Sequence, residues 1–134
     1  MDGVKGLATD KDQFARHVGL EVAQVSPGYA RIKMAVQEYH LNGVGSVHGG
    51  ALFTLADFAL AVASNAHGRT AVGINASIVY VKAARAGVLW AEAREISLNS
   101  KLGNYTVDIT DEDGDLVAVF QGTAYRKKDE AGAR

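Results

Sequence analysis

The most constraining feature of the sequence is an apolar stretch over residues 49–66, in which alanine, leucine and phenylalanine predominate. Its length and its strong helix formers predict one long α-helix. Because apolar side chains face nearly every direction around this helix, other protein has to surround it. The stretch is a poor membrane span, since it is short and carries a carboxylate, Asp57, at its centre. We therefore expect this helix to lie at the centre of the fold.

Segments in which apolar and polar residues alternate lie on both sides of this helix and predict β-strands. The clearest example is the alternation of Ile32 and Met34 with Arg31 and Lys33. Strands are predicted at residues 21–25, 29–37, 71–81, 88–97, 104–110 and 115–125, and a short helix at 11–18. The last four strands are expected to form a meander. The fold class is then α+β, with a curved antiparallel sheet wrapped around the long central helix.

Composition limits the classes of protein to which the chain can belong. Its 134 residues suit one domain, 1–134, with flexible ends at 1–9 and 127–134. The absence of cysteine excludes disulfides and thiolate metal sites, and the histidines lack metal-ligand spacing, so no metal is predicted. A net charge of -1 argues against nucleic acid or an anionic membrane as a partner. The charged start of the chain shows no leader peptide, so we expect a cytoplasmic protein.

Asp57 is the anomaly of the apolar helix, because it is the only charged residue between Gly50 and Ala63. Burial of a carboxylate is costly, so Asp57 is either a functional acid or part of a structural hydrogen-bond network. His48, Gly49 and Gly50 stand at the start of the same helix. Free backbone N–H groups at a helix start can stabilise an oxyanion, and glycine lets a ligand approach them closely. A flexible glycine joint is the alternative interpretation.

The spacing between the glycine-rich helix start and Asp57 limits how the two can act together. Asp57 lies eight residues beyond Gly49, which along a helix is roughly 12 Å. One carbonyl group can hardly contact both residues within a single chain. Two copies of the helix that run side by side in opposite directions would bring them together, as a two-fold dimer allows. If both residues are functional, we expect at least a dimer with two shared sites.

The run of residues 42–57, NGVGSVHGGALFTLAD, together with Ala63-Ser64-Asn65, resembles hotdog-fold acyl-CoA thioesterases, and in particular those of phenylacetate degradation. The similarity extends from the region of Gly19 to Tyr125. It implies a hotdog fold and hydrolysis of a small, medium-length or aryl acyl-CoA. It also implies a homodimer or a dimer of dimers, and no cofactor apart from CoA as part of the substrate.

The resemblance also implies roles for individual residues. Asp57 matches the catalytic carboxylate, which acts as nucleophile or as general base toward water. Gly49 matches the glycine whose N–H polarises the thioester carbonyl, and His48 matches the histidine that orients the glycine loop. Asn42 matches a polar side chain that helps to hold the thioester or the water.

Further residues are candidates for substrate binding. Many relatives have Arg-Pro where this chain has Lys82-Ala83, so Lys82 offers a point charge in place of an arginine fork for a CoA phosphate. The other candidates are Gly50 at the helix start and Thr54 on the helical face of Asp57. Asn75 and Ser77, which with Gly73 share one strand face, either line a tunnel or form an ordinary solvent-facing side. Lys101, in the turn at residues 99–103, either contacts a CoA phosphate or is a solvated turn lysine.

Two alternative functions remain open. A hydroxyacyl thioester dehydratase would need a histidine and an acid placed for β-elimination, and His48 suits a carbonyl clamp better. A non-catalytic acyl-CoA sensor is the second alternative, although a binding protein has no need of Asp57. The sequence leaves open the acyl preference, the pathway, the choice between dimer and tetramer, and the residues that hold the CoA phosphates.

Overall fold

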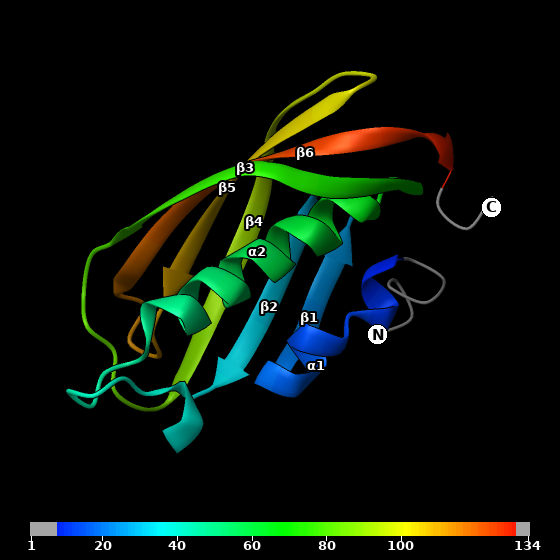
Figure 1. Ribbon diagram of the computed structural model, residues 1–134. Coiled ribbons are helices and arrows are strands. Elements are labelled where there is room, and N and C mark those ends of the chain that lie inside the picture. The colour runs from blue at the N-terminus through cyan, green and yellow to red at the C-terminus, as the bar shows by residue number, and fades with distance from the viewer. Residues whose placement is uncertain (1–7, 131–134) are drawn as a thin grey trace.

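A computed structural model describes residues 8–130 of the chain as one antiparallel sheet that packs against a long helix, α2 (Figure 1). The elements in chain order are η2 (Ala8–Lys11), α1 (Gln13–Val18), β1 (Leu20–Ser26), β2 (Tyr29–Ala35), η3 (Glu38–His40), α2 (Gly49–Asn65), β3 (Arg69–Tyr80), β4 (Val88–Leu98), β5 (Leu102–Thr110) and β6 (Leu116–Glu130). The predicted α+β class and the predicted central helix are confirmed. Residues 1–7 and 131–134, which include most of the expected flexible ends, lie outside the described residues.

The order of the strands in the sheet is β1-β2-β4-β5-β6-β3, and all neighbours are antiparallel. The prediction of a four-strand meander is therefore wrong, because β3 pairs with β6 and not with β4. The meander consists of β4, β5 and β6 alone. After α2 the chain enters the sheet at one edge through β3 and then crosses to pair β4 with β2.

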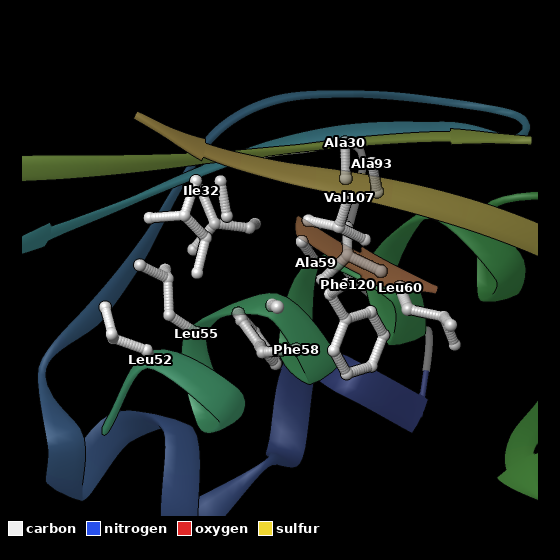
Figure 2. Packing of buried hydrophobic residues seen from close by; sticks show 14 of the residues in the cluster. Ala30, Ile32, Leu52, Leu55, Phe58, Ala59, Leu60, Ala93, Val107 and Phe120 are labelled. Carbon is white, nitrogen blue, oxygen red and sulfur yellow. The ribbon is translucent and has the colours of Figure 1, made fainter. Parts of the chain in front are cut away.

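The hydrophobic core lies between α2 and the sheet. Leu52, Leu55 and Ala59 point from α2 toward Ile32 of β2 and toward Val107 and Phe120 of the other half of the sheet (Figure 2). Ala30, Ile32 and Met34 are fully buried, as their alternation along the second strand predicts. The packing of α2 on the sheet removes much of the apolar surface of the helix from water. This burial provides the main stabilisation of the fold.

One face of α2 is not covered by the rest of the chain, so the prediction that protein surrounds the helix on all sides is wrong for the single chain. Phe53 is 36% exposed, and Asp57 and Gly50 are also exposed. None of the helices in residues 8–130 is long and apolar enough to cross a bilayer.

β3 is the edge strand beside this open face, and its apolar side chains are unusually exposed. Ile74 is 59% exposed, Val79 64% and Tyr80 53%. The pairing with β6 shifts register between Gly73 and Asn75, so a bulge at Ile74 interrupts the alternation that the sequence predicts for residues 71–81. Gly73 and Asn75 therefore lie on opposite faces of the sheet, and not on one face as predicted.

The last strand is longer than its sequence pattern indicates. β6 ends at Glu130, whereas the alternation predicts an end at Tyr125. Its C-terminal part pairs with the start of β3, where Ala71 is opposite Arg126.

We predict that Leu55→Ala lowers the free energy of unfolding by about 2–5 kcal/mol, because it leaves a cavity beneath α2. Leu55 is 0% exposed in the centre of the core. Urea unfolding measures the change. Val44→Ala is the matched control, since Val44 is 82% exposed, and it should change the free energy by less than about 0.5 kcal/mol. Equal losses in the two variants would contradict this account of the core.

Candidate functional site at the start of α2

The N-terminus of α2 is capped by His48. The His48 Nδ1 atom accepts a hydrogen bond of 2.8 Å from the N–H of Gly50. The His48 carbonyl accepts from the N–H groups of Ala51 and Leu52 at 2.9 and 3.1 Å. Among the hydrogen bonds of residues 8–130, none uses the N–H of Gly49. A donor at the positive end of the helix dipole is thus left available for a ligand.

Tyr80, at the end of β3, lies against Gly49. Its hydroxyl donates a hydrogen bond of 3.1 Å to the Gly49 carbonyl. A Cβ atom added at Gly49 would lie 2.9 Å from the Tyr80 hydroxyl oxygen, so a larger residue at position 49 would displace the tyrosine. Sequence reasoning missed Tyr80 as a site residue. Its alternation in β3 indicates a side chain on the helix-facing side of the sheet, but no local signal places it beside Gly49.

A cleft of about 380 Å³ adjoins this helix start, and it brings three predicted site residues together. Asn42, Gly49 and Lys82 line it with Tyr80. The Asn42 amide braces its own loop, since its Nδ2 donates to Ser46 Oγ at 3.0 Å and its Oδ1 accepts from the N–H of Val44 and of Ser46. Asn42 therefore shapes one wall of the cleft.

Lys82 forms ion pairs with two carboxylates at the rim of this cleft. Its Nζ lies 2.8 Å from Asp111 Oδ2 and 2.7 Å from Asp115 Oδ2. The hydrogen bonds to these carboxylates raise the pKa of Lys82, and the same lysine lowers the pKa of Asp111. The cation is thus largely compensated by protein groups, and a phosphate at this position would also meet the two acidic side chains.

A second cleft, of about 570 Å³, lies on the other side of the helix start, toward α1. Three predicted residues, His48, Gly50 and Thr54, line it together with Phe14 and Tyr39. The Thr54 hydroxyl donates to the Gly50 carbonyl at 2.8 Å. The lining is mainly apolar, although it also includes His17 and His40. The start of α2 therefore stands between two clefts of different character.

Asp57 lies on the open face of α2, and the prediction that it is buried within the fold is wrong for the single chain. Its Oδ1 lies 3.7 Å from where a Cβ of Gly73 would stand, which is an ordinary van der Waals distance, so the carboxylate lies next to β3 at Gly73. Desolvation by the surrounding protein raises the pKa of Asp57, and the negative charge of Asp12, the N-cap of α1, adds to the effect. Asp57 lines neither of the two clefts beside Gly49.

The remaining predicted residues lie elsewhere. Asn75 and Ser77 line a groove of about 200 Å³ with Gln121 and Thr123. This groove is on the face of the sheet that points away from α2, because Gln121 and Thr123 alternate with the buried residues of β6. Lys101 is exposed in the turn between β4 and β5. One chain does not bring these three residues together with Gly49 or Asp57.

Comparison with known proteins identifies the family of the chain. The family model described as the thioesterase superfamily matches residues 44–118, which include the glycine-rich helix start, α2 and the edge strand. The chain belongs to the thioesterase superfamily. The predicted resemblance and the predicted hotdog fold are thereby confirmed.

Individual members of the superfamily are similar over most of this chain. The acyl-coenzyme A thioesterase PaaI of Escherichia coli is 34% identical over 118 residues, which cover 87% of this chain and 84% of that protein. The solved structure of the E. coli PaaI protein has a TM-score of 0.87 and 33% identity, and the match covers 90% of this chain and 88% of that one. A protein of Streptococcus pneumoniae described as a hypothetical thioesterase, solved with coenzyme A, has a TM-score of 0.80 and 26% identity over 84% of this chain and 88% of that one.

We predict that Asp57→Asn raises the free energy of unfolding at pH 7, by no more than about 1 kcal/mol because the carboxylate is partly hydrated. The raised pKa means that the folded protein binds the Asp57 proton more tightly than the unfolded chain does. The stability of the parent should therefore fall as the pH rises through this pKa. The difference between parent and variant should shrink as the pH falls toward the ordinary aspartate pKa of about 4, and it should vanish well below that pKa, where aspartate is protonated in both states.

Urea unfolding at a series of pH values measures this difference. Asp113→Asn is the matched control, because Asp113 is an exposed carboxylate in the turn before β6. A loss of stability at pH 7 in Asp57→Asn would contradict the inferred cost of the charge, and would indicate that Asp57 belongs to a stabilising network.

Proposed function

We propose that the protein is an acyl-CoA thioesterase that hydrolyses a small, medium-length or aryl acyl-CoA to the free acid and CoA, with each active site built by two chains. The observation that carries the proposal is the unpartnered N–H of Gly49, a residue that lines the cleft of about 380 Å³ at the start of α2. The presence of an acid with a raised pKa on the same helix supports it. The similarity to the acyl-coenzyme A thioesterase PaaI and the coenzyme A in the S. pneumoniae structure support it too.

In the proposed reaction the thioester carbonyl oxygen binds to the Gly49 N–H. A fixed donor at a helix start stabilises the negative charge that develops on this oxygen in the transition state. A carboxylate then attacks the carbonyl carbon or takes a proton from an attacking water. CoA leaves as a thiolate, which is a good leaving group, so the reaction needs no strong general acid. Single-turnover hydrolysis in heavy-oxygen water separates the two routes, since label in Asp57 itself indicates nucleophilic attack.

The acid of each site comes from the second chain in this proposal. Within one chain Gly49 and Asp57 are eight residues apart on α2, roughly 12 Å along the axis. The open face of α2 and the exposed apolar edge of β3 lie side by side (Figure 1), and such an edge is suited to pairing with a second copy. A two-fold axis there would bring Asp57 of the partner subunit toward the Gly49 N–H. Homodimers, or pairs of them, are the proposed assembly.

The two clefts suit the two arms of the substrate. The larger, mainly apolar cleft, which Phe14 and Thr54 line together with His48 and Gly50, suits the acyl group. The smaller cleft with Asn42 and Lys82 suits the polar pantetheine arm. Because acidic side chains compensate Lys82, additional cations are needed for the CoA phosphates, and Lys101 remains the proposed source. Asn75 and Ser77 also remain proposed contacts, which only the partner's site could use.

The two alternatives differ from the thioesterase in measurable ways. A dehydratase would use His48 as an acid or base, but its Nδ1 accepts the Gly50 N–H and so serves as a helix cap. An acyl-CoA sensor would bind the same ligands without turnover. A panel of acyl-CoA thioesters, assayed for released thiol and for binding, distinguishes the three functions.

We predict that Asp57→Asn reduces thioester hydrolysis by at least about a hundredfold while the affinity for an acyl-CoA changes little. In the parent, the acid limb of the pH profile should lie above the ordinary carboxyl range of about 4, because the pKa of Asp57 is raised. Thiol release measures turnover, and calorimetric titration of the variant measures binding. Unchanged turnover in Asp57→Asn would refute the assignment, and Asp113→Asn again serves as the control.

We predict that a heterodimer of one Asp57→Asn chain and one Gly49→Ala chain regains about half of the parent activity, because one of its two shared sites is intact. Each variant alone should be less active than the heterodimer, since Asp57→Asn removes the acid from both of its sites and Gly49→Ala puts a Cβ atom 2.9 Å from the Tyr80 hydroxyl at both helix starts. Differently tagged chains allow the heterodimer to be purified. Circular dichroism first shows that both variants are folded. An inactive heterodimer of folded chains would place the whole site within one chain.

A further inference from the structure

We propose that Tyr80 is a positioning residue of this site, which directs the Gly49 N–H by holding the adjacent peptide group. The inference rests on the proposed function for the meaning of that N–H, but the contacts of Tyr80 stand independently. Neither the helix cap nor the acid explains why a tyrosine hydroxyl lies against the helix start.

The peptide group between Gly49 and Gly50 is held at both of its ends. Its carbonyl accepts the hydrogen bond of 3.1 Å from the Tyr80 hydroxyl. Its N–H donates the hydrogen bond of 2.8 Å to His48 Nδ1. The two partners come from different elements, because Tyr80 ends β3 and His48 precedes α2. The orientation of this peptide plane is therefore set by the sheet as well as by the helix cap.

Such a restraint matters at a pair of glycines. Glycine has the greatest backbone freedom of any residue, and the first N–H groups of a helix have no intrahelical acceptor to align them. A donor that stabilises an oxyanion has to be oriented before the charge develops. Because the planes on both sides of the Gly49 Cα share that atom, fixing the following peptide limits the direction of the Gly49 N–H.

Tyr80 is not explained by core packing. It is 53% exposed, so its ring adds little to the buried core, and phenylalanine would cover the same surface. The single proton of its hydroxyl is used in the bond to the Gly49 carbonyl, so Tyr80 is not a proton donor to the leaving thiolate. The feature that only tyrosine provides here is the hydrogen bond itself.

We expect Tyr80→Phe to lower kcat by about threefold to tenfold, the usual effect of one neutral hydrogen bond, with KM changed less than about twofold. The chemical shifts of the Gly49 and Gly50 amides should change, and hydrogen exchange at Gly50 should become faster, in the protein without ligand. These amide signals report the peptide directly and do not depend on turnover. Tyr125→Phe is the matched control, since Tyr125 is a partly exposed tyrosine on the outer side of β6.

Several outcomes would overturn the inference. Unchanged kcat in Tyr80→Phe would do so, as would a loss that is confined to KM, because the tyrosine would then only contact substrate. Unchanged Gly49 and Gly50 amide signals would also refute it. Tyr80→Leu removes the aromatic ring as well as the hydroxyl. If KM rises in Tyr80→Leu but not in Tyr80→Phe, the ring contributes to substrate binding as part of the cleft wall, and the hydroxyl acts only through its hydrogen bond. A parent with no turnover on any acyl-CoA would refute the proposed function, while the amide signals would still decide whether Tyr80 holds the peptide.

Discussion

The packing of α2 against the sheet is the interaction on which the rest of the structure depends. Leu52, Leu55 and Ala59 pack one face of the helix against the sheet (Figure 2). This packing sets the position of the helix start. A helix that is buried in this way still has unsatisfied N–H groups at its first turn. His48 accepts a hydrogen bond from one of them, and the N–H of Gly49, which lines the smaller cleft, has no acceptor among the described residues. The packing that stabilises the fold therefore also fixes the position of the donor to which we assign the thioester carbonyl.

The opposite face of α2 holds a carboxylate, Asp57, whose charge lowers the stability of the single chain. Asp57 is an acid among apolar neighbours, and desolvation raises its pKa. Its carboxylate lies next to Gly73 of β3. An uncharged residue at this position would be more favourable for the isolated fold, which is the usual relation between stability and a functional acid. The open face and the exposed edge of β3 together explain why we propose a second chain beside them.

β3 connects the two halves of the candidate site within one chain. Near its start, Gly73 faces the carboxylate of Asp57, and at its end, Tyr80 contacts Gly49. The bulge at Ile74 lies between these two contacts and reverses the alternation of the strand. Through this single strand, the sheet sets the surroundings of both the acid and the helix start. In the proposed dimer the two contacts of one strand would belong to two different active sites.

The sequence by itself determined the central helix, most strand positions and the identity of the residues at the helix start, because propensity, periodicity and capping act between near neighbours in the chain. Only the tertiary structure decided that β3 pairs with β6, that Lys82 faces Asp111 and Asp115, and that Tyr80 reaches Gly49. It also decided that Asp57 is exposed in one chain. These outcomes depend on contacts between residues far apart in the sequence, where the curvature of a sheet and one bulge determine which side chains meet, and local patterns carry no information about either.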